Sequence, residues 1–396
     1  MSLLPYISIM SRIRLKQVYG ASKAILQNRI SRYPESVTSL ENRFATFTGT
    51  KHAISFCNGT SGIEAALYAA DIGVNDEVIV PSCTFHSSID PIVNAGARPV
   101  FADIDPASFT IDVSDVSRKI TDRTRAIIVV HLFGTPANME GLKALTAGRN
   151  IVIIEDTSHA HGAVYQGKIC GSMGDFGVFS LQGDKAIAGG EGGIVVTNDR
   201  KSWIKMSMWG HFDRHANLFG ELDCEDFRWT GIGYKRRMAP ISAIIAAADF
   251  DFINQKNALF RKNTEILDAE LSGIDGISIS GCYPGSVKGG LFSGYPISIN
   301  KGENAVVKVL DALKKAGITA YSWPYATHHK LHIYTNPECR VMKARSSHIP
   351  AYDQASYPVL PVTEHLNANG ILLSKKYTCT LNADSRAKIR KVFRSF

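Results

Sequence analysis

The chain has 396 residues, of which 45% are hydrophobic and 20% are charged. This is the composition of an ordinary soluble globular protein, long enough for more than one domain. No apolar run approaches the roughly 20 residues that cross a bilayer, so no membrane partner is expected. The formal net charge of +8 suits a small anionic substrate. The basic stretches are short and dispersed, which argues against a nucleic-acid partner.

The seven cysteines are scattered and form no C-x-x-C pair, so we expect neither a zinc site nor a disulfide framework. A reducing cytoplasm is the expected location. Near the start, Pro5 interrupts the apolar residues, and the basic residues follow them rather than precede them. That order is not typical of a secretory signal, and it favours a surface segment or docking helix over about residues 1–35.

The first two-thirds of the chain alternates apolar β-branched runs with helix-like segments. Such runs are typical of strands buried on both faces of a largely parallel sheet that helices wrap, which is the α/β class. Helices are expected between several strands, including one from about residue 60 and one over 137–147. Strands are expected at HAISF (52–56), EVIVPS (77–82), RPVFADI (98–104), AIIVVHLF (126–133), IVIIED (151–156), GVFSL (177–181) and GGIVVTND (192–199).

After about residue 250 the pattern changes. A long amphipathic helix is expected over 252–273, short strands at GISISG and GYPISIN, and a basic amphipathic helix at DSRAKIRKVFRSF. We therefore predict a large domain over 1–250 and a smaller α+β domain over 251–396, with the segment of about 1–35 docking onto the small domain or a partner.

One lysine stands between an apolar run and a cluster of glycines in FSLQGDKAIAGGEGG (179–193). Lys185 there could grip a phosphate, point into solvent or act as a covalent catalyst. A P-loop role is excluded because the glycines follow the lysine instead of preceding it. The choice between the other roles depends on the groups that accompany Lys185.

Several candidate groups follow strands, at the edge where α/β sheets bind ligands. In CNGTSG (57–62), Gly59 allows close backbone approach, Thr60 offers a hydroxyl, and the new helix offers free N–H groups. These features suit a phosphate, although an ordinary capped turn has the same form. Asp156 is either a helix cap or an acceptor aimed into a cleft. Phe85 is either core or a face for a planar ligand.

His159 and His161 also follow the strand that ends at Asp156. Two histidines without a third ligand are weak evidence for a metal, so no metal is expected, and His161 suits a structural role. A lysine, a phosphate cradle, an aromatic face and a strand-end carboxylate are together the parts that hold pyridoxal phosphate. The amine forms a Schiff base with the aldehyde, and the carboxylate keeps the pyridine nitrogen protonated.

The ordered motifs carry a family resemblance over about residues 40–247, and a weaker one beyond. The chain resembles the DegT/StrS-type pyridoxal-phosphate-dependent sugar aminotransferases, which have the aspartate aminotransferase fold (fold type I). The motifs are NGTS, DEVIVPSCTF, GARPVFADID, VVHLFG, IEDTSHAHGA, GDFGVFSLQGDK and GEGGIVVTND.

The resemblance implies a role for each matching residue. Lys185 is the Schiff-base lysine, Asp156 is the partner of the pyridine nitrogen, and Phe85 stacks on the ring. His159 stands where the family commonly has glutamine, and it faces the cofactor's phenolic oxygen. The phosphate contacts come from Gly59, Thr60, Ser61 and Ser180. The family's dehydratase branch has histidine in place of the lysine, so lysine favours amino transfer.

Two segments depart from the family pattern. KRRM (235–238) stands where the family has N-Y-R-M, so Lys235 would contact the phosphate of a neighbouring subunit, serve an anionic substrate, or be a solvated loop lysine. Arg236 is the second candidate for binding an anionic substrate. In THHKLHIY, His329 matches the family's substrate-side histidine. GILLSKKYT lacks the usual leucine-proline ending.

The resemblance implies a cytoplasmic homodimer with shared active sites, which moves an amino group from glutamate or glutamine to a keto or aldehyde sugar. Such enzymes make amino sugars of lipopolysaccharide, surface glycans or secondary metabolites. The acceptor is a nucleotide-linked ketosugar, a free sugar acid of the 8-oxo octulosonate type, or a keto-inositol. A non-catalytic regulator with the same fold is the alternative of another class. A nicotinamide dehydrogenase lacks support, because CNGTSG is not a G-x-G-x-x-G fingerprint.

Overall fold

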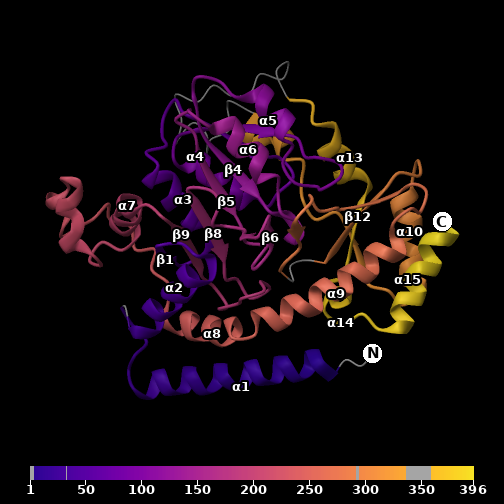
Figure 1. Cartoon of the computed structure of the whole chain (residues 1–396), viewed down its shortest axis with the longest axis horizontal. Helices are drawn as coiled ribbons and strands as arrows, with labels where there is room; N and C mark the ends of the chain where they lie inside the picture. Colours follow the sequence, from indigo (N-terminus) through magenta and orange to yellow (C-terminus); the bar gives the residue numbers. More distant parts are fainter. Residues whose placement is uncertain (1–3, 33, 291–293, 336–357) are drawn as a thin grey trace.

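A seven-stranded sheet forms the centre of the larger part of the molecule in the computed structural model (Figure 1), which describes residues 4–32, 34–290, 294–335 and 358–396. β9 runs antiparallel to both of its neighbours, whereas β8, β5, β4, β2 and β3 run parallel to one another. In spatial order the strands are β1 (His52–Phe56), β9 (Gly193–Thr197), β8 (Phe176–Ser180), β5 (Val152–Asp156), β4 (Thr124–Val130), β2 (Glu77–Pro81) and β3 (Arg98–Ala102).

Helices cover both faces of this sheet. In β4, Ile128 packs into the core on one face, and Ile127 and Val129 pack into the core on the other. Because both faces are buried, the strand is apolar at consecutive positions. One face carries α3 (Gly59–Ala69), α4 (Asp90–Asn94) and α7 (Arg200–Gly210). The other carries α2 (Glu35–Thr48), α5 (Val113–Lys119), α6 (Met139–Thr146) and α8 (Pro240–Phe250).

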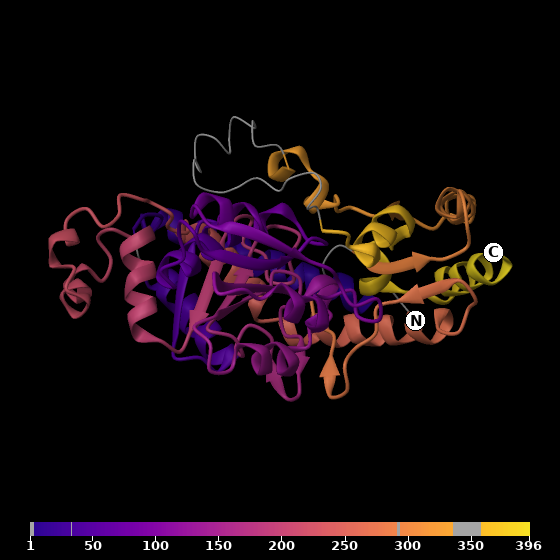
Figure 2. The same cartoon turned by 90° about the horizontal axis from the view of Figure 1, so that it is seen from above.

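A smaller four-stranded antiparallel sheet lies beside the large one (Figure 2). Its core is shared with helices from the last third of the chain. The strands, in spatial order, are β10 (Ile277–Ile279), β12 (Tyr295–Ile299), β14 (Gly370–Leu373) and β13 (Ala320–Ser322). These helices are α9 (Ile253–Leu271), α10 (Ala305–Lys315), α14 (Lys375–Thr380) and α15 (Ala383–Ser395). Two more helices of this part of the chain, α11 (His332–Thr335) and α13 (Pro361–Asn369), pack Tyr334 and Leu366 into the core of the large sheet.

A short three-stranded sheet connects the two parts. β11 (Ser286–Val287) pairs with β6 (Val164–Tyr165), which also pairs with β7 (Lys168–Ile169). The 3-10 helices are η1 (His86–Ser88), η2 (Leu132–Gly134), η3 (Ala216–Leu222), η4 (Glu225–Phe227) and η5 (His328–Lys330).

The architecture confirms the predicted fold class, a mostly parallel sheet wrapped by helices with a smaller α+β part. A break between α8 and α9 falls beside residue 250, and the domain boundary placed there stays a prediction. Ile253 and Phe260 of α9 pack into the core that α2 and α8 share with the large sheet. The long helix α9 therefore stabilises both parts at once.

The N-terminal segment forms α1 (Leu4–Leu26), which lies along α8 (Figure 1). Ile13 and Ala24 are buried on its inner face, and Lys16 pairs with Asp251 at the end of α8, 2.7 Å away. Near the start of α1, Tyr6 interacts with the thiol of Cys379 in α14. The segment thus contacts elements of both parts.

The carboxylate of Asp103, just beyond β3, caps α13 of the smaller part. It accepts hydrogen bonds from Val362 N (3.0 Å), Thr363 N (2.8 Å) and Thr363 Oγ1 (2.7 Å). We expect Asp103→Ala to lower the free energy of unfolding by about 2 kcal/mol, because the buried donors lose a charged acceptor. Urea titration of both proteins measures this loss. Asp122→Ala, in an exposed turn before β4, is the control, and an equal loss in both variants would contradict the capping role.

Candidate active site

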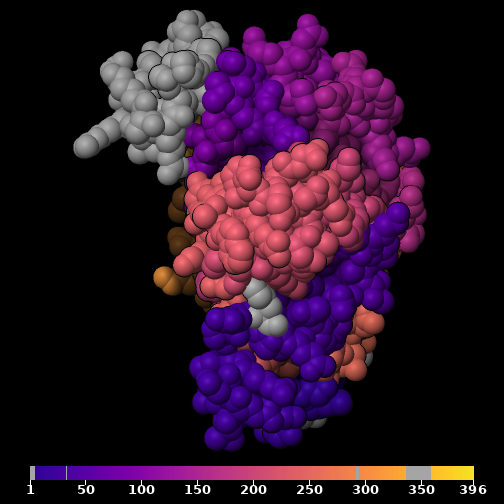
Figure 3. Space-filling view, turned by 90° about the vertical axis from the view of Figure 1, so that its left-hand side faces the viewer, coloured from indigo at the N-terminus to yellow at the C-terminus, as the bar shows by residue number. Residues whose placement is uncertain are grey.

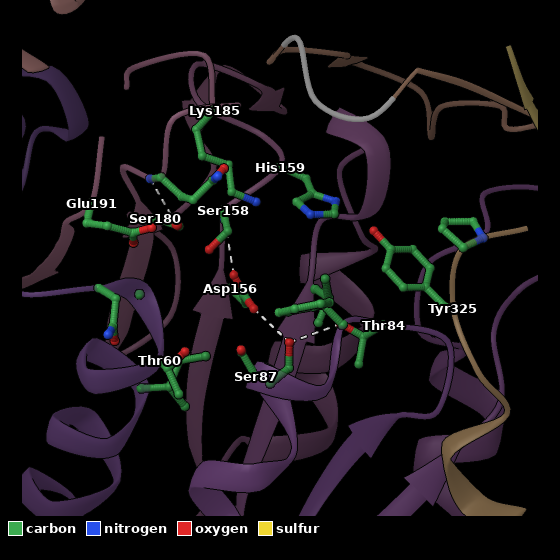
Figure 4. Close-up of a pocket in the computed structure, with 18 residues that line it drawn as sticks. Thr60, Thr84, Ser87, Asp156, Ser158, His159, Ser180, Lys185, Glu191 and Tyr325 are labelled. Carbon is green, nitrogen blue, oxygen red and sulfur yellow. Dashed lines mark hydrogen bonds between the residues drawn. The ribbon is translucent and has the colours of Figure 1, made fainter. Parts of the chain in front are cut away.

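A cavity of about 540 Å³ opens at the carboxyl edge of the large sheet (Figure 4). Its walls come from the first turn of α3, from η1, from the ends of β5 and β8, and from the segment before η5. The parallel order of β2, β4, β5 and β8 brings these strand ends to one side. Of the predicted site residues, the cavity is lined by Gly59, Thr60, Phe85, Asp156, His159, Ser180 and Lys185.

The start of α3 lines one end of the cavity, where the sequence predicts an anion cradle. The side chain of Asn58 accepts a hydrogen bond from Ser61 N, 2.8 Å away, and so caps the helix. A Cβ atom on Gly59 would lie 3.0 Å from Ser180 Cβ, a tight contact that glycine avoids where the backbone approaches β8. The hydroxyls of Thr60 and Ser180 line the same end of the cavity. Ser61 is buried beside Cys57 and does not itself line the cavity.

Asp156 ends β5, and its buried carboxylate is held in place from two sides (Figure 4). Ser88 Oγ donates to Oδ2 over 2.7 Å, and Ser158 N donates to Oδ1 over 3.1 Å. The Ser88 hydroxyl is itself bonded to Thr84 Oγ1 at 3.0 Å. These hydroxyls hold the carboxylate in the cavity wall. There it can accept a hydrogen bond from a protonated ring nitrogen.

Lys185 lies in the turn between β8 and β9, and its backbone N–H bonds to Gln182 O, 2.9 Å away. Burial lowers the pKa of Lys185 to about 8, although the charges of Asp156 and Asp184 act in the opposite direction. A pKa this low leaves a useful fraction of the amine neutral near neutral pH. A neutral amine is the form that attacks carbonyl carbons and accepts protons.

His159 faces the cavity from the loop after β5 (Figure 4). Burial, then Lys185, then His161 hold its pKa well below the ordinary value, so the imidazole is neutral. The ring of Tyr325 stacks with it, with centroids 6.4 Å apart. Burial likewise lowers the pKa of His161 to about 3, and its Nδ1 accepts from Ile187 N over 3.1 Å. The hydrogen bond to the Ile187 backbone fits the structural role predicted for His161, which stays a prediction.

The ring of Phe85 follows β2 and is 51% exposed although it lines the cavity. An exposed aromatic face at a cavity wall suits stacking against a planar ligand. Several polar lining residues were not found from the sequence, namely Ser87, Ser88, Ser158, Gln182, Glu191 and Tyr325. Ser87 and Ser88 lie two and three residues after Phe85, so their place just beyond β2 could have indicated them.

The structure does not bring three predicted substrate or cofactor residues to this cavity. His329 is fully buried between Ser82 Oγ (2.8 Å) and Glu364 Oε1 (3.1 Å). The ammonium of exposed Lys235 lies 5.4 Å from the centre of the Phe212 ring. Arg236 lines a separate cavity of about 270 Å³ beside α3 and α4.

Neither a cluster of possible metal ligands nor a membrane-spanning helix is found in the described ranges. Within residues 4–32, 34–290, 294–335 and 358–396, no three His, Cys, Asp or Glu side chains are grouped so as to hold a metal ion. Among the helices in those ranges, none combines the length and apolar character that crossing a membrane requires.

Comparison with known proteins places the chain in a family. Residues 15–370 match the model of the DegT/DnrJ/EryC1/StrS aminotransferase family, so the chain belongs to that family. The match confirms the resemblance inferred from the motifs.

Among solved structures, an aminotransferase from Psychrobacter cryohalolentis is 26% identical with a TM-score of 0.81, covering 96% of this chain and 95% of that one. A sugar aminotransferase from Micromonospora echinospora is 25% identical with a TM-score of 0.79, covering 96% of each chain.

The curated relatives carry several activities. A GDP-perosamine synthase of Escherichia coli O157:H7 is 38% identical over 240 residues, which is 58% of this chain and 64% of that protein. An L-glutamine:2-deoxy-scyllo-inosose aminotransferase of Micromonospora echinospora is 30% identical over 339 residues, 82% of this chain and 79% of that protein. A pleiotropic regulatory protein of Geobacillus stearothermophilus is 40% identical over 250 residues, 63% of each. The chain spans less than two thirds of the GDP-perosamine synthases that it matches.

The lowered pKa of Lys185 predicts a pH profile in the cofactor-free protein. Reductive methylation of Lys185 needs the neutral amine, so its rate should reach half of its maximum near pH 8. In the folded chain this pKa lies below the unfolded one, so the associated stability is present at high pH and is lost as pH falls through about 8. Peptide mass spectrometry after timed labelling measures the rate.

Asp156→Asn serves as the control in this experiment. Removing a charge that raises the pKa of Lys185 should move the midpoint to lower pH. A midpoint near the ordinary lysine value of about 10.4 in the parent protein would contradict the buried environment.

Proposed function

We propose that the chain is a pyridoxal-phosphate-dependent aminotransferase that moves an amino group from glutamate or glutamine to a keto or aldehyde sugar in the cytoplasm. The observation that carries this proposal is the meeting of Lys185, Asp156 and the 57–62 turn around one cavity. The six cysteines in the described ranges are free thiols, which supports a reducing compartment.

The residues present fit the cofactor group by group. The N–H groups at the start of α3, with Thr60 and Ser180, would hold the phosphate. Asp156 would pair with the pyridine nitrogen, and Phe85 would cover the ring. The neutral imidazole of His159 would bond to the ring oxygen without adding a charge. When bound, pyridoxal phosphate supplies an aldehyde for amines and a ring that accepts electrons.

The chain's own chemistry centres on one amine. Lys185 Nζ is neutral in part near pH 8, so it can take the proton from the donor's α-carbon and later return one to the acceptor carbon. Ser88 and Ser158 keep Asp156 from turning away while Lys185 moves. Because these groups are held close together around one cavity, the reacting groups do not have to meet by diffusion.

The substrate class rests on the relatives and on charge. The net charge of +8 and the similarity to a GDP-perosamine synthase support an anionic, nucleotide-linked ketosugar. A free sugar acid of the 8-oxo octulosonate type carries a comparable charge. A keto-inositol is favoured by the similarity to an inosose aminotransferase, which extends over 82% of this chain.

A second candidate is a regulator without turnover, which the similarity to a pleiotropic regulatory protein favours. The Lys185 amine with its lowered pKa and the hydrogen-bonded Asp156 carboxylate favour catalysis instead.

A homodimer with shared sites is part of the proposal. Among the described lining residues of the cavity, Lys185 is the only lysine or arginine, so a bound phosphate needs a cation from elsewhere. The segment from α7 to Lys235 projects from one side and fills the centre of the face in Figure 3. It exposes Trp229 (82%) and Tyr234 (46%), and a second copy would cover such rings. Lys235 of each copy would then reach the other copy's phosphate.

The Lys185→Ala variant tests the activity. Purified parent protein with pyridoxal phosphate should show a coloured linkage that borohydride fixes onto Lys185, and glutamate or glutamine should bleach it. Keto or aldehyde sugars are then screened for return of the colour. In Lys185→Ala, amino transfer should fall by at least about a thousandfold, and normal turnover there would overturn the assignment. A linkage that no amino donor bleaches would favour the regulator.

Subunit complementation tests the role of Lys235. We expect Lys235→Met to lower cofactor retention and turnover about tenfold by removing the shared cation, whereas Lys51→Met, also exposed, should change neither. Mixing Lys185→Ala with Lys235→Met should restore about a quarter of the parent activity, because mixed dimers contain one intact site. No recovery on subunit exchange would place Lys235 outside a shared site.

A further inference from the structure

A buried ion pair lies behind the turn that carries Lys185. Lys256 in α9 and Asp249 in α8 are each only 4% exposed, and their charged atoms are 2.7 Å apart. Neither residue lines the cavity of the candidate active site. Burying two charges costs desolvation energy that their attraction seldom exceeds, so stability alone does not explain the pair.

Both charged groups form hydrogen bonds with the backbone just after Lys185. Lys256 Nζ donates to Ala186 O over 2.5 Å, and Asp249 Oδ2 accepts from Ala188 N over 2.8 Å. Between them, Ile187 N donates to His161 Nδ1 over 3.1 Å. Three consecutive residues are therefore each held by a side chain from another element.

Apolar packing also holds part of the turn, because the side chains of Ala186 and Ile187 are buried in the core that α2 and α8 share with the large sheet. Glycines stand at 183, 189 and 190, and Gly190 has a φ of +81° that favours glycine. Behind the turn lies a second cavity of about 290 Å³, lined by Lys185, Ala188, Asp249 and Lys256 and by side chains of α1. On the side of this cavity, the backbone of the turn is held by its hydrogen bonds to Lys256 and Asp249.

We propose that Asp249 and Lys256 are positioning residues that hold the 186–188 backbone and thereby fix the Cα atom of Lys185. The proposal rests on the proposed function, in which the Lys185 side chain is released and must return to the same place. A fixed Cα atom limits this motion to side-chain torsions and keeps the amine at a high effective concentration. A mobile turn would spread the amine over a larger volume and slow its return.

Two double variants remove the pair without leaving a buried unpaired charge. Asp249→Leu/Lys256→Met replaces both groups with apolar side chains of similar size. In Asp249→Asn/Lys256→Met, an amide oxygen can still accept from Ala188 N, so one of the two bonds is kept. Lys16→Met is the matched control, because it breaks the exposed Lys16–Asp251 pair at the end of the same helix.

The first measurement is amide hydrogen exchange of peptides covering 182–190 in the cofactor-free proteins. We expect exchange at 186–188 to be fastest in the Leu/Met variant, by at least roughly tenfold over the parent, intermediate in the Asn/Met variant, and unchanged in Lys16→Met. This reading does not depend on any activity of the protein. It therefore separates failure of the positioning role from failure of the proposed function.

The second measurement is the rate at which added pyridoxal phosphate becomes linked to Lys185, followed by borohydride trapping. The rate should fall roughly tenfold in the Leu/Met variant and less in the Asn/Met variant. Parent-like exchange and linkage rates in both double variants would overturn the proposal. If the Leu/Met variant does not fold, the Asn/Met variant against the parent decides it in the same way.

Discussion

The carboxylate of Asp156 is the fixed point around which the candidate site is arranged. β5 is buried between two layers of helices, and it pairs in parallel with β4 and β8, so its last residue cannot shift without moving the sheet. Ser88 and Ser158 then set the direction of the carboxylate. The start of α3 and the Lys185 turn follow β1 and β8 of the same sheet, so strand spacing brings both near Asp156.

Burial and charge act against each other at Lys185. Desolvation favours the neutral amine, while Asp156 and Asp184 favour the ammonium. The balance leaves the pKa near 8, close enough to neutral pH for proton transfer in both directions. His159 is deeper and next to a cation, so its imidazole is neutral. One pocket thus holds an ionisable lysine and a neutral histidine because the two differ in burial and in the sign of nearby charges.

Strand ends were predictable from the sequence, and side-chain directions were not. IVIIED and AIIVVHLF are mostly apolar because both faces of the sheet are covered, so the strands and the residues just after them could be located. That is why Lys185, Asp156 and Phe85 could be placed together. His329 lies in a short 3-10 helix, and only tertiary packing decides that its ring faces Ser82 and Glu364. Tyr325 reaches the cavity from a segment far along the chain, which no local pattern indicates.

Lys256 is a second residue whose position the sequence does not indicate, because it is buried where an exposed side chain is expected. In the sequence it belongs to a helix rich in Asn, Lys and Arg, where a lysine normally faces solvent. It is buried because α9 crosses beneath the β8–β9 turn, where Asp249 and the carbonyl of Ala186 give its ammonium partners. A polar group that folding forces inside must satisfy its hydrogen bonds there. In this chain those bonds go to the backbone next to Lys185, so the cost of burying Lys256 and the order of the Lys185 turn have a common origin.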